Sequence, residues 1–344
     1  TYDTTRVLMG IHPSCFDWKL EAGESFQTPE AVMVYTDQGL NHLSQTFHRL
    51  YQKRLARGYW RDRERPILIN NWEATCFDFT EEKLLEIART AKETGVELFV
   101  LDDGWFGERS NEHAGLGDWF ANTKRLPQGI TGLSKKIGEI GMKFGLWFEP
   151  EMVNKDSDLY RQHPDWIIAA PERRQSHGRF QYVLDFSRTE VVDYIYSMME
   201  TLLSDADISY IKWDMNRSIT EGFSNTLPAD RQGEVYHRYI LGVYELYERL
   251  IGRFPQILFE SCASGGGRFD PGMLYYAPQG WTSDDTDAME RLKIQYGTSY
   301  CYPVSSMGSH VSVTPNQQVN RDTPLSTRAN ANRCRHTACC KQIF

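Results

Sequence analysis

The sequence lacks any run of lysine and arginine, and it also lacks a long apolar stretch. The formal net charge of −8 is spread over 344 residues without a basic cluster. The electrostatic footprint that phosphate backbones require is therefore missing, which argues against nucleic acid as a partner. The longest apolar stretches, such as residues 98–101 and 166–170, fall far short of the roughly 20 residues that cross a bilayer. We therefore expect no membrane span.

Nucleotide-binding loops and serine nucleophile elbows are missing too. Neither GxGxxG nor GxxxxGK[ST] occurs, and the glycine run at 265–267 lacks the strand, spacing and lysine of a phosphate loop. We expect these glycines to serve a tight turn or a close backbone approach to a ligand. No GxSxG is present around Ser261 and Ser264. Cys262 as a nucleophile remains an alternative that needs a histidine base, whereas most free cysteines act as small buried hydrophobes.

Cysteine spacing and the N-terminal segment exclude further classes. Of the seven cysteines, Cys334, Cys339 and Cys340 fall within the last eleven residues without metal-ligand spacing. We therefore predict neither disulfides nor a zinc site. The first ten residues, TYDTTRVLMG, have no basic start followed by an apolar core. This pattern lacks a secretory signal and predicts a cytoplasmic location.

The composition and length fit one barrel-sized globular domain with an appendage. Hydrophobic residues make up 40% and charged residues 24%, as in ordinary globular proteins. An α/β barrel commonly takes about 250 residues in one domain. Aromatic residues reach 13%, and although most of these belong in the core, sugar pockets also use aromatic faces.

The chain divides into a short β-rich part and a long alternating part. In residues 1–38 the runs RVLMGI and AVMVY are separated by Pro13, Gly23 and Pro29, a pattern that predicts the last strands of a β-domain. In residues 39–62 the segment HLSQTFHRLYQKRL has apolar residues at helical spacing. It predicts a connecting helix.

Residues 63–332 alternate strand-like and helix-like segments. The eight strand candidates are PILINNW, ELFVLDDGW, KFGLWFEPEM, YVLDFS, YIKWDMN, ILFESCASGG, the segment around Trp281, and YPVSSMGSH. Repeated βα units give an open sheet or a barrel, and eight of them favour a (β/α)8 TIM barrel. An open sheet would gather its polar residues at one switch point. Here they sit at or just past many strand ends, where barrel enzymes carry their sites: Trp72, Asp102, Trp147, Asp185, Asp214, Cys262 and Asp284.

The segment KWDMN contains the first candidate catalytic carboxylate. Because side chains alternate along a strand, Lys212, Asp214 and Asn216 should face one way, and Trp213 and Met215 the other. A lysine ammonium close to Asp214 would lower the pKa of its carboxyl group, as a carboxylate nucleophile requires. The alternative is a buried structural ion pair, since such pairs also perturb pKa values.

The segment WTSDDTD contains the second candidate. Its acids Asp284, Asp285 and Asp287 could form a solvated loop or a helix cap, and for Asp287 we predict the N-cap of the helix that follows. Like charges and burial would raise the pKa of one member, as a general acid requires, and Asp284 is nearest the strand end. Two carboxylates at strand ends fit a glycosidase. His310 could also line the pocket, although an isolated histidine is more often a satisfied structural residue.

Six longer motifs carry a resemblance to a known family. They are WKLEAGESFQTPEAV, LDDGWFGER, GLWFEPEMV, YIKWDMNR, ESCASGGGRFDPGML and WTSDDTDAMER. Together they resemble glycoside hydrolase family 36, the bacterial α-galactosidases, from about residue 6 to residue 332. The resemblance implies retaining hydrolysis of terminal α-galactosides such as melibiose and raffinose, without a metal or organic cofactor. It also implies a homo-oligomer, which is a tetramer in full-length relatives.

The resemblance assigns roles to individual residues. Asp214 matches the nucleophile and Asp284 the acid/base of a double displacement, for which a carboxyl separation of about 5 to 5.5 Å is expected. Trp72 matches a residue that lines the pocket. The positions that match galactose-holding residues are Asp102, Asp103, Trp147, Arg179, Lys212, Asn216, Cys262 and Gly265.

Both ends of the chain depart from the family pattern. Family members begin with a large β-sandwich, of which residues 1–38 would supply only the final strands. The tail at 333–344, RCRHTACCKQIF, does not match, so we expect a fragment of a longer protein. The alternatives are a galactosyltransferase of the raffinose-synthase type, an α-N-acetylgalactosaminidase, and an inactive sugar-binding fragment.

Overall fold

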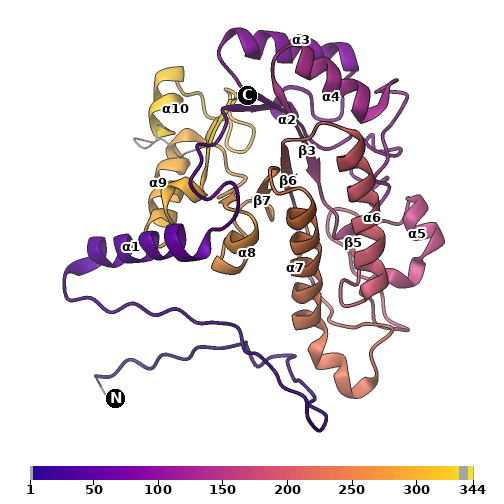
Figure 1. Ribbon diagram of the computed structural model, residues 1–344, viewed down its shortest axis with the longest axis vertical. Coiled ribbons are helices and arrows are strands. Elements are labelled where there is room, and N and C mark those ends of the chain that lie inside the picture. The colour runs from indigo at the N-terminus through magenta and orange to yellow at the C-terminus, as the bar shows by residue number, and fades with distance from the viewer. Residues whose placement is uncertain (1–2, 333–339, 344) are drawn as a thin grey trace.

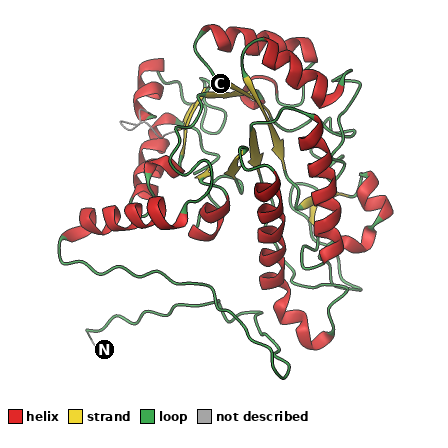
Figure 2. Ribbon diagram, in the orientation of Figure 1, coloured by secondary structure: helices red, strands yellow, loops and turns green. Residues whose placement is uncertain are grey.

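The computed structural model describes residues 3–332 and 340–343. Its centre is a curled parallel sheet surrounded by helices, giving an α/β fold (Figures 1 and 2). The strands run in the order β8-β7-β6-β3-β2-β1-β10-β9. A further parallel bridge joins Gly280, in the strand at one end of this order, to Met307, just before the strand at the other end. The strands are β1 (Leu68–Asn70), β2 (Leu98–Leu101), β3 (Lys143–Phe148), β6 (Tyr210–Trp213), β7 (Leu258–Ser261), β8 (Gln279–Gly280), β9 (Gly308–Val311) and β10 (Cys340–Ile343).

The helices pack around this sheet because each has one apolar face. In α3, for example, Thr80 caps the N-terminus by accepting a 3.3 Å hydrogen bond from the Lys83 amide, while Leu84 and Ala88 are buried. The helices are α1 (Gly39–Leu50), α2 (Trp72–Thr75), α3 (Glu81–Glu93), α4 (Gly129–Glu139), α5 (Asp158–Gln162), α6 (Thr189–Asp205), α7 (Val235–Arg253), α8 (Pro271–Tyr276), α9 (Ala288–Ser299) and α10 (Leu325–Ala331). None of the helices in the described ranges is both long and apolar enough for a membrane crossing.

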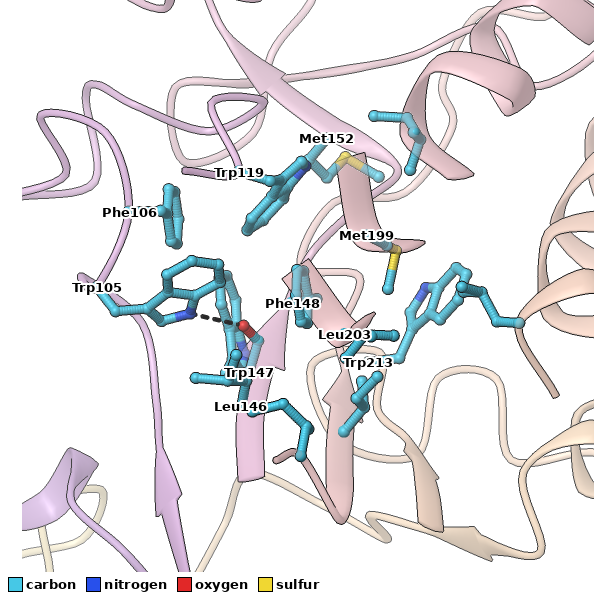
Figure 3. Close-up of a cluster of buried hydrophobic side chains, with 14 of the residues drawn as sticks. Trp105, Phe106, Trp119, Leu146, Trp147, Phe148, Met152, Met199, Leu203 and Trp213 are labelled. Atoms are coloured by element: carbon cyan, nitrogen blue, oxygen red, sulfur yellow. Dashed lines mark hydrogen bonds between the residues drawn. The ribbon is translucent and has the colours of Figure 1, made fainter. Parts of the chain in front are cut away.

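An aromatic core supports the strand that carries Trp147. Figure 3 shows Trp105, Phe106, Trp119 and Phe148 packed beside β3, with the Trp105 indole N–H donating to the carbonyl oxygen of Trp147 at 2.9 Å. The rings of Phe106 and Trp119 lie 4.5 Å apart in a tilted arrangement. Such pairs favour tilted and edge-to-face geometry. This aromatic cluster therefore fixes the carboxyl end of β3.

One predicted barrel strand lies outside the main sheet. The segment YVLDFS forms β5 (Gln181–Val183), which pairs antiparallel with β4 (Met152–Asn154) in a separate two-stranded sheet. The physical reason is that β3 pairs directly with β6, Gly145 lying opposite Tyr210, so no position between them is open. The prediction that Asp185 lies at the barrel mouth is therefore wrong, and its carboxylate is bonded locally by Ser187 instead. The main sheet contains β10 from the C-terminal segment in addition to the other predicted strands.

The N-terminal segment also differs from prediction. No strand forms between residues 3 and 38 of this structure; the segment runs as an extended arm below the sheet and its helices (Figure 1). A strand needs a partner for its N–H and C=O groups, and RVLMGI and AVMVY meet none. The arm instead packs Trp18 against His237 at the start of α7, with ring centroids 5.4 Å apart. The arm is followed by helix α1 and a π-helical turn over Tyr51–Leu55, so helical structure ends before residue 62 of the predicted connecting segment.

Candidate active site

A polar cavity of about 170 Å³ lies at the carboxyl ends of the parallel strands, the edge where barrel enzymes carry their sites. Nine of the eleven residues predicted for the site line it. They are Trp72, Asp102, Asp103, Trp147, Arg179, Lys212, Asp214, Asn216 and Asp284. The cavity also includes His310, which was considered as a lining residue, and five residues that were not anticipated: Glu73, Trp281, Thr286, Gln317 and Gln318. Cys262 and Gly265 are not among the lining residues; Cys262 hydrogen-bonds Asp214, and Gly265 forms a bridge with Ser283.

Asp214 follows β6 and is held as a carboxylate. Its Oδ2 atom accepts hydrogen bonds from the Asn216 amide at 2.8 Å and the Trp147 indole at 3.2 Å. Burial acts to raise the pKa of Asp214, but the Lys212 ammonium and the hydrogen bonds from Asn216, Cys262 and Trp147 outweigh it and leave the pKa below its ordinary value. The predicted alternation is confirmed, because Trp213 points into the core and stacks on Tyr247 at 4.0 Å.

The ion-pair partner of Lys212 is Asp102 rather than Asp214. The Lys212 ammonium lies 3.2 Å from Asp102 Oδ2, and Asn70 donates to the same oxygen. Lys212 therefore forms its ion pair with Asp102 and not the structural pair with Asp214 that was the alternative, and it lowers the pKa of Asp214 through space. One largely buried ammonium group thus stabilises two carboxylates, Asp102 after β2 and Asp214 after β6.

Asp284 has the opposite electrostatic setting. Burial raises the pKa of its carboxyl group, as does the negative charge of Asp214, while Lys212 and a 3.1 Å hydrogen bond from the Trp281 indole oppose the shift without cancelling it. The like charge that matters is Asp214, across the cavity, rather than the acids next to it in sequence. Asp287 caps α9 as predicted, accepting 3.1 Å hydrogen bonds from two backbone amides.

A third buried carboxyl group lies behind Asp214. Glu149, just after β3, accepts a hydrogen bond from the backbone N–H of Asn216. It accepts a second, at 2.8 Å, from the side-chain amide of Gln181. Burial, followed by the charge of Asp214, raises the pKa of Glu149 to about 8. The group is therefore mainly protonated at neutral pH and adds little repulsion to Asp214.

Asp103 is oriented by a buried arginine. Arg109 donates from Nε and Nη2 to the two oxygens of Asp103 at 2.9 and 2.8 Å, a bidentate geometry that fixes the plane of the carboxylate. Arg109 is 1% exposed and also donates to Asn154 at 3.1 Å. The β4 segment therefore contributes to the site indirectly.

Cys262 and Gly265 shape the wall between the two carboxylates. Cys262 is buried, and burial followed by the charge of Asp214 raises the pKa of its thiol well above the usual value. The thiolate that a nucleophile needs is thereby disfavoured. Gly265 adopts φ +88°, and a Cβ atom there would lie 2.5 Å from Ser283 Cα and 2.6 Å from the Asp284 nitrogen. Because glycine has no Cβ atom, the backbone that carries Asp284 can lie against the loop after β7.

Gly265→Ala should therefore lower activity by displacing Asp284. A shift of about 1 Å in a reacting group can cost about 10²-fold in rate, so we expect kcat/KM to fall by about one to two orders of magnitude while the protein remains folded. Gly252→Ala is the matched control, because a Cβ atom there meets nothing within 4 Å. Steady-state kinetics and thermal melting of both variants check this; equal kinetics in the two variants would contradict it.

Arg179 reaches the cavity from a strained loop. Arg179 and Phe180 both have positive φ, at 52° and 60°, which is uncommon for residues other than glycine. The Arg179 guanidinium lies 3.7 Å from Glu112, and Phe180 packs on the His113 ring at 3.7 Å between centroids. Strained backbone of this kind is concentrated at functional sites.

Glu73 connects three loops at the rim, and no motif in the sequence points to it. Its carboxylate accepts hydrogen bonds from Thr286 at 3.2 Å and the Val313 amide at 2.7 Å, and it lies 3.1 Å from His310 Nε2. Burial lowers the pKa of His310 to about 4 despite this carboxylate. Glu73 directly follows Trp72, a predicted pocket residue. This adjacency is the feature of the sequence that could have indicated Glu73 as part of the site.

The fold and the cavity define an α/β protein with a two-carboxylate site at the carboxyl edge of a parallel sheet. One carboxyl group has a lowered pKa and the other a raised pKa, the pairing that separates a nucleophile from a general acid.

Comparison with known proteins gives the family. The sequence pattern of the melibiase family matches residues 25–336. The chain is 62% identical to alpha-galactosidase AgaA of Geobacillus stearothermophilus over 327 residues, which are 95% of this chain. It is 54% identical to alpha-galactosidase Mel36A of Lactobacillus acidophilus over 322 residues, which are 94% of this chain. The chain belongs to the melibiase family, glycoside hydrolase family 36.

Solved structures agree with this assignment. The crystal structure of the GH36 alpha-galactosidase AgaA superimposes with a TM-score of 0.94 at 59% identity, over 97% of this chain and 46% of that one. A variant of the same enzyme was crystallised with raffinose, and another with stachyose. The chain spans less than half the length of these relatives, 45% of AgaA and 44% of Mel36A.

Proposed function

We propose that this chain carries the catalytic site of a retaining α-galactosidase that releases terminal α-linked galactose from oligosaccharides of the melibiose and raffinose type. The observation that carries the proposal is the placement of Asp214 and Asp284 on one cavity with pKa values shifted in opposite directions. Asp214 attacks the anomeric carbon while Asp284 protonates the departing oxygen. Water activated by Asp284 then releases galactose with its configuration retained.

The remaining cavity residues are suited to hold the sugar. Asp102, Asp103 and Lys212 offer charged acceptors and donors for hydroxyl groups. Trp147 and Trp281 both line the cavity and offer aromatic surface to a sugar ring. The Trp147 indole donates to Asp214 and the Trp281 indole to Asp284. The small polar cavity suits one pyranose ring, with the rest of the oligosaccharide outside it.

The test is an assay of the purified chain with p-nitrophenyl α-galactoside, melibiose and raffinose. Release of α-galactose as the first-formed anomer, followed by NMR, supports the proposal; release of β-galactose contradicts the retaining mechanism. Transfer of galactose to sucrose in preference to water would indicate a galactosyltransferase, and faster hydrolysis of the N-acetylgalactosaminide would indicate an α-N-acetylgalactosaminidase. A folded chain that binds galactose without turnover would indicate a sugar-binding fragment.

We also propose a domain organisation for the chain. Residues 63–332 supply seven parallel strands of a (β/α)8 barrel, supported by the strand order and by the bridge between Gly280 and Met307. Residues 39–62 connect this barrel to residues 1–38, which form the final strands of a β-sandwich when partner strands are available. The apolar side chains of Val7, Leu8 and Met33, which are exposed in the arm, support this role. Residues 337–344 stand outside the matched family pattern, which ends at residue 336 rather than at 332 as predicted; residues 333–339 and 344 lie outside the described residues.

The pH dependence of hydrolysis follows from the two shifted groups. Activity requires Asp214 ionised and Asp284 protonated. The rate should rise with pH as Asp214 loses its proton, at a pKa below its ordinary 3.8, and fall as Asp284 loses its proton, at a pKa above 3.8. We expect a bell-shaped profile of kcat/KM whose two limbs belong to the coupled pair. In Asp284→Ala the basic limb should disappear; its persistence would assign that limb to another group.

A further inference from the structure

The loop that carries Asp284 is held by one buried arginine of α9. Arg291 donates from Nη1 to the Thr282 hydroxyl at 2.6 Å, from Nε to the Asp285 carbonyl at 2.9 Å, and from Nη2 to the Ser283 carbonyl. These three acceptors lie within two residues of Asp284, two before it and one after it. Arg291 is fully buried, and its guanidinium bonds two backbone carbonyls and one hydroxyl of this loop.

Arg291 also supports the side chain that bonds Asp284. Its guanidinium carbon lies 4.4 Å from the centroid of the Trp281 ring, within the range of a cation–π contact. On the same indole, Nε1 donates to Asp284 Oδ1 at 3.1 Å. Arg291 thus contacts both the backbone around the acid and the ring that orients its carboxyl group.

The opposite side of this loop is fixed as well. Gly265 forms a bridge with Ser283, and its missing Cβ atom lets the two backbones touch. Burial lowers the pKa of Arg291 to about 10, so the side chain stays charged at neutral pH. Burying a charged group costs desolvation free energy unless hydrogen bonds compensate for it. A lysine ammonium could not supply these bonds, because its donors do not lie in one plane.

We propose that Arg291 is a positioning residue for acid/base catalysis: it fixes the 282–285 loop and Trp281 so that Asp284 meets the oxygen of the departing group. The proposal rests on the proposed α-galactosidase function. Arg291 does not touch the cavity, so its effect must reach the substrate through Trp281 and Asp284.

The test compares Arg291→Gln and Arg291→Lys on two substrates that differ in leaving group. Raffinose needs protonation of its departing sugar, whereas a dinitrophenyl α-galactoside needs little. We expect kcat for raffinose to fall by about 10²-fold, with a much smaller change in the rate of glycosylation by the aryl substrate and in KM. The lysine variant should recover little of the loss, because it lacks the planar fork. The basic limb of the pH profile should also move.

Arg321→Gln is the matched control. Arg321 pairs with the N-cap Asp287 and with Glu290 in the first turn of α9, so its loss removes a charge near the same helix without touching the 282–285 loop. An equal loss on both substrates in Arg291→Gln, or the same substrate ratio as in Arg321→Gln, would overturn the proposal. Should Arg291→Gln fail to fold, the ratio measured in Arg291→Lys decides in the same way.

The two hypotheses fail differently. A wild-type chain without α-galactosidase activity defeats the proposed function, while an active wild type with an unchanged substrate ratio in the arginine variants defeats only the role of Arg291. Hydrogen exchange of the amides at 283–285 provides a reading that does not depend on activity. These amides should exchange faster in Arg291→Lys than in Arg321→Gln, and equal exchange would show that Arg291 does not fix the loop.

Discussion

Asp214→Ala should lose essentially all hydrolysis, with kcat reduced on the order of 10⁴-fold or more, as for other nucleophile deletions. The reason is that no neighbouring carboxylate can replace it: Asp102 is paired with Lys212, and Glu149 lies behind the strand end with its two oxygens bonded. Sodium azide should restore turnover of an activated aryl galactoside by entering the space left by the side chain. The product should be β-galactosyl azide, because the anion attacks from the nucleophile's side.

The control for this experiment is Asp207→Ala, an exposed acid just before the same strand. It removes an equal charge at the opposite end of β6 and should keep normal kinetics. Product configuration is read by NMR. Near-normal hydrolysis by Asp214→Ala, or an α-configured azide from it, would refute the assignment of the nucleophile.

Asp284→Ala should reduce hydrolysis of raffinose by about 10² to 10⁴-fold, the usual contribution of a general acid. The loss should be smaller in the glycosylation step of a dinitrophenyl α-galactoside, whose leaving group departs without a proton. With that substrate the glycosyl-enzyme should accumulate, since Asp284 also activates the water that hydrolyses it. Azide should then yield the α-configured product by attack on the intermediate.

Asp285→Ala tests whether Asp284, rather than the neighbouring Asp285, is the acid/base. The Asp285 side chain does not line the cavity, and its carboxylate accepts only a 3.1 Å hydrogen bond from the Asp287 amide among the bonds described. We expect it to retain activity. Equal losses in Asp284→Ala across leaving groups, or a larger loss in Asp285→Ala, would count against Asp284 as the acid/base.

Local sequence patterns predicted those features that depend on neighbouring residues. Strand periodicity placed Lys212, Asp214 and Asn216 on one face, and the preference of aspartate for helix N-termini identified Asp287 as a cap. The same local rules failed for residues 3–38 and for YVLDFS. Both segments have strand-like composition, but whether a strand forms, and in which sheet, depends on the partner that its backbone meets.

Motifs and short-range periodicity were enough to predict the family, the parallel α/β alternation and nine of the residues that line the cavity. The folded structure was needed to see that Lys212 pairs with Asp102, that Asp214 raises the pKa of Asp284, and that Arg291 bonds the loop that carries Asp284. The first two interactions join side chains from the ends of different strands, and the third joins helix α9 to the loop before it. Electrostatic effects depend on distance and burial rather than on separation along the chain.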